Sequence, residues 1–461
     1  MQHFDLCVIG SGSGNSIIDE QFGDQRVALV DKGERFGGTC LNVGCIPTKM
    51  FVYPAELASS VERAKRVGVT IGEVQADWPA IRDRIFGRID PISEGGEQWR
   101  LSNDNVTLYR EAANFTGPKQ LLIGDETITA DRFVLAAGSR PQIPVLPGMD
   151  DPRVAERLHT SDDVMRLETL PASLVIIGGG FVAAEFAHIF ASFGTTVTLL
   201  QRSDVLLRKE DADIAQAFTE QLAKRVNVRL KQSVIGFEFT ERDTVIVESV
   251  DPDGIHYDFE TKRVLIAQGR VPNSDLLNLQ ATGVTLHPDG RVVVDEQQQT
   301  VVKGIFALGD VSSASQLKHV ANHEARVVQH NLLHPRRMIA SDHRFIPHAV
   351  FSDPQIAAVG LTEQQAEQTG RKFVTVRQPY ASVAYGWAME DDAHFVKLIA
   401  DPRTKRLLGA HIIGPEATTL IQPLIQAMSF DLDVPSMARG QYWTHPALTE
   451  VVENALLALK L

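Results

Sequence analysis

The sequence predicts an α/β protein with two Rossmann-like dinucleotide-binding domains and a C-terminal α+β domain. An apolar run that leads into a glycine cluster occurs at residues 4–15 and again at 173–187. Each follows the order strand, glycine turn, helix, which brings the pyrophosphate of a dinucleotide to a helix N-terminus. From about residue 346 the chain alternates strand and helix patterns, as in LLGAHIIG at 407–414, and this predicts the third domain.

The first glycine cluster, GSGSGN, follows the apolar run FDLCVIG and precedes a helical stretch. Gly10 and Gly12 form a G-x-G, which lets the chain turn tightly and approach a pyrophosphate. Asn15 stands where a third small residue is usual, and Gly14 beside it partly compensates. Asp31 ends the next strand, RVALVD, 21 residues after Gly10, where an acid can hydrogen-bond ribose hydroxyls.

The second cluster, SLVIIGGGFVAAEFA, completes the pattern G-x-G-x-x-A. The three residues of this pattern are Gly178, Gly180 and Ala183. The strand that follows, TTVTLLQR, ends in Gln201 and Arg202 instead of an acid, and Arg208 comes six residues later. Arginines at this place favour a 2′-phosphate, so this site is predicted to prefer NADPH over NADH. The alternative is that both arginines are solvated surface charges.

The segment GGTCLNVGCIPTK, residues 37–49, holds two of the three cysteines of the chain, Cys40 and Cys45. In a regular helix their Cα atoms would lie about 8.6 Å apart, whereas a disulfide needs about 4.4–6.8 Å. The segment must therefore bend, and Gly44 supplies the freedom. Two close thiols in a cysteine-poor chain favour a redox dithiol over a static loop staple. Zinc sites use shorter spacings and four ligands, so no metal is predicted. Cys7 is expected to be an inert core residue.

Composition excludes several classes of protein. The 461 residues are 44% hydrophobic and 22% charged, as in an ordinary globular protein. A net charge of −13 argues against nucleic acid as a partner. The longest apolar region, 174–200, contains Glu185, His188 and a triple glycine, so it is not expected to cross a membrane. The N-terminus has no basic segment with a cleavage site, which together with the cysteine count predicts a cytoplasmic protein.

Two dinucleotide sites beside a dithiol imply a flavin, because a nicotinamide does not pass electrons readily to a disulfide. The predicted cofactors are therefore FAD and NADPH. With these motifs the chain resembles the flavoprotein disulfide reductases, the family of glutathione reductase and dihydrolipoamide dehydrogenase. The resemblance rests on GGTCLNVGCIPTK and on four further motifs in the same order: AAGSRP at 136–141, GRVPN at 269–273, ALGD at 307–310 and HPALTE at 445–450.

The resemblance implies roles for further residues. Asp310 would bind the ribityl chain of the flavin, Lys49 would lie near the flavin paired with Glu185, and Phe181 would be an aromatic gate over the ring. From the residues alone, Lys49 and Glu185 could be surface charges and Asp310 a turn cap. Other positions that the resemblance places at the cofactors are Ser13, Lys32, Gly38, Thr39, Ala113, Gly138, Val182, Gly269 and Arg270.

The same resemblance divides the chain. Residues 1–150 and 272–345 would form the FAD-binding domain, 151–271 the NADPH-binding domain, and 346–461 a dimerisation domain.

His445 and Glu450 suit a general base with an orienting carboxylate. By resemblance they would serve the active site of the other subunit, so the protein is expected to be a homodimer with shared active sites. Cys45 would face the flavin, and Cys40 would be the exposed thiol that attacks the substrate disulfide. His445 would protonate the leaving thiolate.

A closer likeness concerns the actinobacterial mycothione reductase subfamily, through GSGSGNSIIDE, CIPTKMFVY, NHEARVVQHNLL, VAYGWAMEDD and ARGQYWTHPALTEVVENALL. It implies mycothione, the disulfide of a cysteinyl–glucosamine–inositol, as the small-molecule substrate. Glutathione reductases hold a substrate carboxylate with an arginine where this chain has Glu20, which would repel it. Dihydrolipoamide dehydrogenase, glutathione reductase and a flavoprotein without enzymatic activity are the alternatives.

Overall fold

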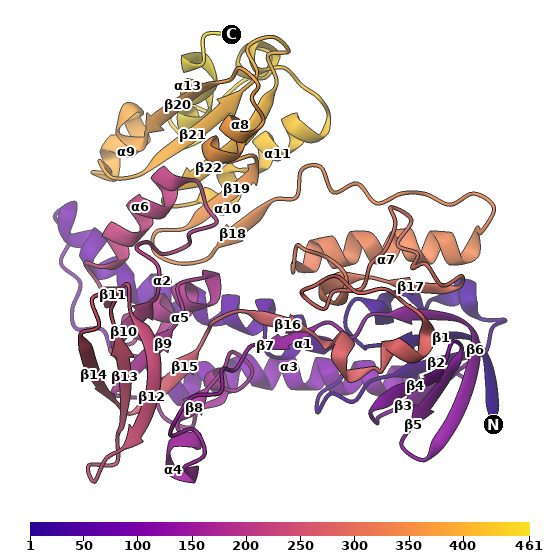
Figure 1. The fold of residues 1–461 in the computed structure, drawn as a ribbon. Coiled ribbons are helices and arrows are strands. Elements are labelled where there is room, and N and C mark those ends of the chain that lie inside the picture. Colours follow the sequence, from indigo (N-terminus) through magenta and orange to yellow (C-terminus); the bar gives the residue numbers. More distant parts are fainter. The chain divides into compact units, whose positions relative to one another are not determined.

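The computed structural model describes residues 1–461. The chain divides into two compact units, each built from three stretches of sequence (Figure 1). The first unit contains Met1–Thr48, Arg82–Gln142 and Gly269–His343, and the second contains Lys49–Ile81, Ile143–Gln268 and Arg344–Leu461. Most of the expected FAD-binding domain lies in the first unit. The second unit holds the expected NADPH-binding and dimerisation domains together, with residues 49–81 added to them.

A seven-stranded sheet forms the centre of the first unit. Its order is β3-β2-β1-β6-β5-β4, with β17 paired to β6. The strands are β1 Gln2–Ile9, β2 Val27–Val30, β3 Val106–Tyr109, β4 Ala113–Gly117, β5 Gln120–Ile123, β6 Glu126–Leu135 and β17 Ile305–Ala307. β1 is parallel to both of its neighbours, β2 and β6, and β17 is parallel to β6. The two strands predicted around the first glycine cluster are β1 and β2.

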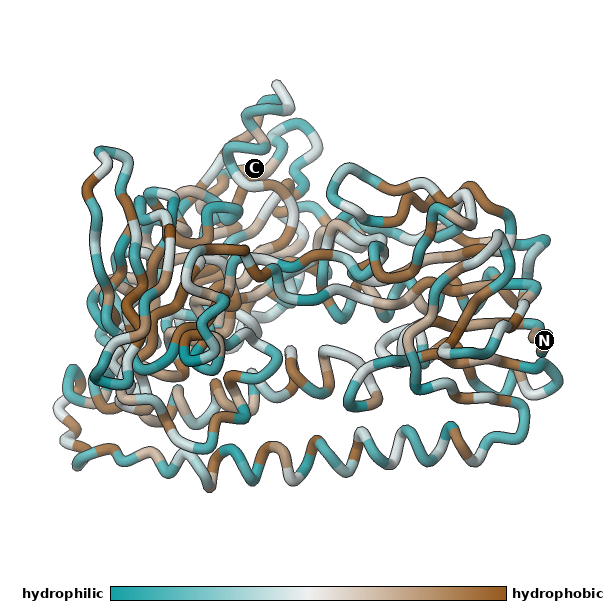
Figure 2. Tube along the Cα trace, turned by 60° about the horizontal axis from the view of Figure 1, so that its bottom comes forward, coloured by the Kyte–Doolittle hydropathy of each residue, from teal (hydrophilic) through white to brown (hydrophobic).

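Both faces of this sheet are covered, as expected for parallel strands that are apolar throughout. On β1, Phe4 and Ile9 belong to one buried cluster and Leu6 and Val8 to another. The second cluster includes residues of α7, Lys318–Leu333. Figure 2 shows longer hydrophobic stretches along the strands than along the helices. Cys7 lies on β1 and is fully buried, and burial raises the pKa of its thiol.

The helix predicted after the first glycine cluster is wrong. Two short 3-10 helices, η1 Gly14–Ile17 and η2 Glu20–Phe22, take its place. The reason is a buried arginine from α3, Trp78–Leu101. Arg100 donates to the carbonyl oxygens of Asn15 and Ile18, at 2.6 and 2.8 Å, and to the Asn15 side chain at 2.6 Å. These carbonyls are thereby satisfied without the i to i+4 ladder of an α-helix.

The second unit contains a five-stranded sheet that is parallel throughout, in the order β11-β10-β9-β15-β8. The strands are β8 Leu158–His159, β9 Ser173–Ile177, β10 Thr196–Gln201, β11 Asn227–Leu230 and β15 Arg263–Ile266. The helices α5, Phe181–Ser192, and α6, Ala212–Leu222, follow β9 and β10. A three-stranded antiparallel sheet of β12 Ser233–Phe239, β13 Val245–Val250 and β14 His256–Thr261 lies in the same unit. This is the second Rossmann-like domain that the sequence predicts.

The C-terminal part of the second unit is a five-stranded antiparallel sheet with helices, so the α+β prediction is confirmed (Figure 1). The strands are β18 His348–Val350, β19 Ile356–Gly360, β20 Val374–Pro379, β21 Phe395–Ala400 and β22 Leu407–Ile413. The helices are α8 Glu363–Gln368, α9 Ala384–Ala388, α10 Ala417–Leu420, α11 Gln422–Ser429, α12 Val434–Arg439 and α13 Glu450–Ala458. None of the helices of the chain combines the length and apolar character needed to cross a membrane.

Trp78 explains why residues 49–81 group with the second unit. Its ring stacks on Phe51 at 5.1 Å and on Phe190 of α5 at 5.5 Å between ring centroids. Its indole N–H donates to the carbonyl of Leu167 at 2.8 Å. Aromatic pairs of this kind contribute about 0.5–1.5 kcal/mol each beyond the burial of their surface, so they hold residues 49–81 to the rest of the second unit.

A buried lysine joins α6 to the C-terminal sheet. The Nζ of Lys397, on β21, lies 2.7 Å from Asp211, 2.8 Å from Asp213 and 2.6 Å from Glu363. The Lys397 and Asp211 side chains are only 3% and 0% exposed. Removing one partner of a buried ion pair leaves an uncompensated charge, which costs about 3–5 kcal/mol.

We therefore expect Lys397→Met to lower the free energy of unfolding by about 3–5 kcal/mol. Lys372→Met is the matched control, because Lys372 is exposed and lies in the same sheet domain, and it should change stability by less than about 0.5 kcal/mol. Urea unfolding of the two variants measures the difference. Equal unfolding midpoints would contradict the structural role of Lys397.

Candidate active site

The first glycine turn is shaped for a dinucleotide. Gly10 has φ +116°, and a Cβ there would lie 2.2 Å from the Ala136 carbonyl oxygen, so the turn requires glycine. At Gly12 a Cβ would meet nothing closer than 3.9 Å, which leaves the backbone open to a ligand. A Cβ on Gly14 would approach the Ala136 Cβ to 2.5 Å. Gly14 thus performs the close packing usually given to the third small residue, and Asn15 is free to bind Arg100.

Asp31 directly follows β2, beside the glycine turn. Its Oδ1 accepts the Gly33 N–H at 2.7 Å, and its Oδ2 lies 3.8 Å from Arg110. Burial raises the pKa of this carboxyl, while the Gly33 hydrogen bond and Arg110 oppose the shift. Lys32 beside it is exposed. Asp31 therefore offers a carboxylate at the strand end, where ribose hydroxyls would lie in this type of fold.

The dithiol segment is built directly onto the first glycine turn. The Gly37 N–H donates to Ser11 Oγ at 2.8 Å, and a Cβ on Gly38 would lie 2.7 Å from the Gly12 Cα. The short helix α1, Gly38–Asn42, begins at this contact. The sequence places Gly38 and Thr39 at the cofactor, and the structure places Gly38 against Gly12 and leaves Thr39 exposed.

The predicted bend between the two thiols is present. Cys40 lies in α1, and Cys45 is the first residue of α2, Cys45–Arg66. The break falls at Val43 and Gly44, and a Cβ on Gly44 would lie 2.8 Å from the Thr39 carbonyl oxygen. Glycine is needed here for close approach of the backbone.

The two thiols differ in exposure in this structure. Cys45 is exposed at the start of α2, whereas Cys40 is half-buried. The pKa of Cys40 lies above its usual value, because its thiol is hydrogen-bonded to Cys45 and is half-buried, while Lys318 acts in the opposite direction. No disulfide joins the two cysteines in this structure, and the thiol of Cys40 is instead hydrogen-bonded to Cys45.

Lys318 is a residue that the sequence did not indicate. It begins α7, and its Nζ donates to Ser13 Oγ of the first glycine cluster at 2.8 Å. Ser13 Oγ in turn donates to Asn322 of α7 at 3.2 Å. The glycine turn, the dithiol and the N-terminal turn of α7 therefore form one site. Residues 13 and 318 are 305 positions apart, and no local pattern connects them.

Asp310 lies in η6, Gly309–Val311, and takes part in a polar chain. Its Oδ2 accepts from Ser139 Oγ at 2.6 Å, and Ser139 Oγ accepts from Arg270 Nε at 2.8 Å. Ser139 and Arg270 lie on the paired strands β7, Ser139–Pro141, and β16, Arg270–Pro272. Gly138 has φ +67°, and a Cβ there would meet nothing within 4 Å.

Two further positions expected at the cofactors, Gly269 and Ala113, lie beside β16 and on β4. Gly269 accepts the Gln142 N–H through its carbonyl at 2.9 Å, beside β16. Ala113 begins β4 with its side chain in the core, so only its backbone could reach a ligand.

The second glycine turn repeats the geometry of the first. Gly178 has φ +127°, and a Cβ there would lie 2.3 Å from the Ala267 carbonyl oxygen. At Gly180 a Cβ would meet nothing within 4 Å, and Ala183 is fully buried in α5. In both units the first glycine makes the turn and the second leaves open space, which fits two dinucleotides.

The loop after β10 is tied to this second turn. Leu207 N–H donates to the Gly179 carbonyl at 2.7 Å, which brings the neighbouring Arg208 to the glycine turn. Gln201 is nearly buried, with Nε2 bound to Ser203 at 2.6 Å. Arg202 and Arg208 are both exposed. The strand therefore ends in Gln201 where an acid is usual, and two exposed arginines follow it, with Asp204 between them.

Lys49 and Glu185 form the pair that was expected. Lys49 Nζ lies 2.8 Å from both carboxylate oxygens of Glu185, and the Glu185 side chain is 3% exposed. The Phe351 N–H donates to Glu185 Oε1 at 3.0 Å, and Lys49 Nζ stands 4.7 Å from the centre of the Phe351 ring. Phe351 is not among the site residues that the sequence predicts.

Phe181 and Val182 begin α5, with Phe181 exposed.

His445 and Glu450 are also brought together. His445 Nδ1 lies 2.7 Å from Glu450 Oε1, and the histidine side chain is 72% exposed. The other carboxylate oxygen accepts the Ala447 N–H at 3.3 Å. The hydrogen bond with His445 lowers the pKa of Glu450. The arrangement orients an accessible imidazole, as a general acid–base group requires. Glu450 is the first residue of α13, Glu450–Ala458.

Comparison with known families decides the class. Residues 4–325 match the pyridine nucleotide-disulphide oxidoreductase family, and residues 346–456 match the dimerisation domain of the same family. The chain belongs to the pyridine nucleotide-disulphide oxidoreductases. Members of this family are flavoproteins that use FAD and NAD(P)H, so the predicted enzyme class, fold class and flavin are confirmed. The C-terminal match fits a homodimer that acts on a small-molecule disulfide.

Individual relatives agree with the family. This oxidoreductase is 50% identical to mycothione reductase of Mycobacterium tuberculosis over the whole of both chains. It is 33% identical to dihydrolipoyl dehydrogenase of Halobacterium salinarum, over 98% of this chain and 95% of the other. Among solved structures it resembles the HOCl-induced flavoprotein disulfide reductase RclA of Escherichia coli, with 27% identity, a TM-score of 0.85, and 98% and 99% of the two chains covered.

Proposed function

We propose that this protein is an NADPH-dependent mycothione reductase, which works through the Cys40–Cys45 dithiol in the cytoplasm. The observation that carries the proposal is the dithiol segment packed onto the first glycine turn, through the Gly37–Ser11 hydrogen bond. This contact joins the segment of the thiols to the first glycine turn, which supports a role for them beside the cofactor. The 50% identity to mycothione reductase over both whole chains supports the substrate.

The residues that would hold the cofactors follow from the two turns. The first turn, with Asp31 and Asp310, would hold FAD, and the second turn, with Arg202 and Arg208, would hold NADPH. The flavin, when bound, supplies the relay that carries the two electrons of NADPH to the disulfide of the protein. Cys45 is exposed at the start of α2, where a planar ring could cover it.

The dithiol reduces the substrate by two exchanges. Cys40 attacks one sulfur of the substrate disulfide, which forms a mixed disulfide and releases the first thiolate. Cys45 then attacks the Cys40 sulfur, so the Cys40–Cys45 disulfide forms and the second thiolate leaves. The hydrogen bond with Cys45 favours the protonated form of Cys40, so Cys40 needs a base before it attacks.

His445 would be that base, and then the acid that protonates the leaving thiolate. Glu450 holds Nδ1 of its ring at 2.7 Å, which leaves Nε2 for the proton transfers. We assign this histidine to the active site of the partner subunit in a homodimer, so that each site needs both chains. Lys49, Glu185 and Phe181 are assigned to the flavin side of the site.

The substrate also carries sugar rings, which need hydrogen-bonding groups. Glu20 is exposed at the start of η2 and is one candidate to accept from a sugar hydroxyl. A carboxylate at this place would repel the carboxylates of glutathione, which favours a substrate without them.

A disulfide panel tests the proposed function. We expect NADPH oxidation by the purified yellow protein with mycothione, and far slower oxidation with glutathione disulfide or lipoamide. Faster turnover of dihydrolipoamide with NAD⁺ would identify a dihydrolipoamide dehydrogenase. A protein that binds FAD but reduces no disulfide would not be an enzyme of this class.

Cofactor choice provides a separate prediction. Charge-assisted hydrogen bonds contribute about 1.5–3 kcal/mol each. Replacing both Arg202 and Arg208 with glutamine should therefore raise the KM for NADPH by about 100-fold or more, while the KM for NADH changes little. Steady-state kinetics with both nucleotides measure this. Lys224→Gln, on an exposed lysine after α6, is the control and should alter neither constant. A wild-type preference for NADH would contradict the assignment.

A further inference from the structure

Three elements of the second unit meet at two separate polar junctions. The elements are α2, α5 and the link Phe351–Gln355 between β18 and β19. At the first junction Lys49 of α2, Glu185 of α5 and the Phe351 N–H are joined, as described above. The second junction joins the same three elements farther along each of them, and nothing in the proposed chemistry uses it.

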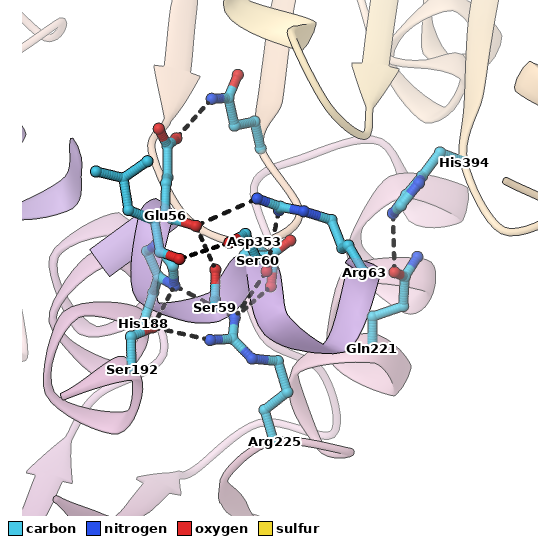
Figure 3. A network of polar contacts seen from close by, with 12 residues as sticks. Glu56, Ser59, Ser60, Arg63, His188, Ser192, Gln221, Arg225, Asp353 and His394 are labelled. Atoms are coloured by element: carbon cyan, nitrogen blue, oxygen red, sulfur yellow. Dashed lines mark hydrogen bonds and ion pairs between the residues drawn. The ribbon is translucent and has the colours of Figure 1, made fainter. Parts of the chain in front are cut away.

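Asp353 is the centre of the second junction (Figure 3). Its Oδ2 lies 3.5 Å from Arg63 of α2 and 3.4 Å from Arg225, which lies between α6 and β11. Its backbone carbonyl accepts a hydrogen bond from Arg225 Nη1 at 3.1 Å. Arg63 also donates to the Glu56 carbonyl at 3.2 Å, which fixes the guanidinium along α2.

Arg225 connects Asp353 to α5. Its Nη2 donates to Ser192 Oγ at 3.0 Å, and its Nη1 lies 3.2 Å from Nδ1 of His188. Burial, followed by the charge of Arg225, lowers the pKa of His188 to about 3, so this histidine is neutral and accepts from the guanidinium. Glu185, His188 and Ser192 follow one another at helical spacings of three and four, so they share one face of α5.

The link between the two junctions is short and fastened at each residue. Phe351 is bound to Glu185, and Ser352 Oγ donates to the Ala184 carbonyl at 3.3 Å. Asp353 is bound to Arg225. The contact to Arg225 is made only two positions after the contact to Glu185, a span of about 7 Å of extended chain. A displacement of Asp353 must therefore move Phe351 relative to Glu185.

We propose that Arg225 is a positioning residue, which holds Phe351 against the Lys49–Glu185 pair by clamping Asp353 to α5. The inference rests on the proposed function, in which that pair lies on the flavin side of the site. Arg225 touches neither Lys49 nor Glu185 and acts through the link. Loss of its guanidinium leaves Asp353 bound to Arg63 alone and frees the link from the C-terminal end of α5.

The experiment compares Arg225→Met and Arg225→Lys with Lys224→Met in the FAD-loaded protein. Lys224 precedes Arg225, is exposed, and loses the same charge, so it is a matched control. We expect Arg225→Met to slow flavin reduction by NADPH by roughly 3- to 30-fold in rapid mixing. Arg225→Lys should reduce the flavin at a rate between those of Arg225→Met and wild type. Lys224→Met should reduce it at the wild-type rate. Oxidation of the reduced dithiol by the disulfide should stay within about twofold of wild type.

Hydrogen exchange gives a readout that does not depend on turnover. Amides of the Phe351–Gln355 link should exchange faster in Arg225→Met than in wild type. In Lys224→Met the same amides should exchange at the wild-type rate. A double-mutant cycle with Glu185→Gln completes the test, because Arg225→Met should slow that variant less than twofold further if it acts through Glu185.

Three results would overturn the proposal: unchanged flavin reduction in Arg225→Met, unchanged exchange of the link, or equal slowing in the Glu185→Gln background. If Arg225→Met does not fold, Arg225→Lys and Asp353→Asn replace it in the same measurements of flavin reduction and hydrogen exchange. A wild-type protein that NADPH does not reduce would refute the proposed function alone, because the exchange comparison still tests the clamp.

Discussion

Cys40→Ser is expected to abolish turnover of the disulfide substrate, with a loss of at least about 10⁴-fold, because serine cannot form the mixed disulfide. Cys45→Ser should abolish turnover as well, so absorbance is used to separate the two variants. Two-electron reduction of the wild type should produce a long-wavelength band from the contact between the Cys45 thiolate and the flavin. Cys40→Ser should keep or strengthen this band, and Cys45→Ser should lose it.

The buried cysteine is the control for this experiment. Cys7→Ala removes the third thiol from the core of the first sheet and should leave both the band and turnover in place. Swapped phenotypes of the two serine variants would reverse the assigned roles of Cys40 and Cys45. That outcome would leave the dithiol itself intact as the redox centre.

His445→Ala is expected to slow disulfide turnover by about 10²–10⁴-fold, the usual contribution of a general acid–base group. Flavin reduction by NADPH should remain nearly unchanged, because the imidazole acts only when thiols exchange. Rapid mixing with NADPH alone, and then with the disulfide, separates the two half-reactions. Equal slowing of both would contradict the role given to His445.

Mixed dimers test whether the active sites are shared. A His445→Ala chain is paired with a Cys40→Ser chain, with a different affinity tag on each. If each site takes its histidine from the partner, one site has both groups and the other has neither, so about half of wild-type activity returns. If His445 serves its own chain, both sites lack one group and activity stays low.

The largest parts of the fold could be predicted because they depend on local constraints. β1 and β2 follow from apolar runs, and the turn at Gly10 follows from a backbone that only glycine adopts. The same holds for Gly178. The pairing of Lys49 with Glu185 was expected from resemblance and that of His445 with Glu450 from the residues themselves, and both pairs are present.

Other parts of the site could not be predicted from local pattern. The helix expected after the first glycine turn is replaced by 3-10 turns because Arg100, 85 residues away, satisfies the Asn15 carbonyl. The half-buried state of Cys40 depends on how α1 packs on the glycine turn.

The sequence by itself therefore determined two glycine turns of the dinucleotide-binding type, a pair of closely spaced thiols and the class of the enzyme. Each of these depends on residue types at short, fixed spacings, because backbone sterics and thiol chemistry act over a few residues. Only the tertiary structure decided that Lys318 meets Ser13, that Phe351 holds Glu185, and that Arg225 clamps Asp353. These contacts join residues that are 305, 166 and 128 positions apart, so they exist only once packing has brought distant helices and strands together.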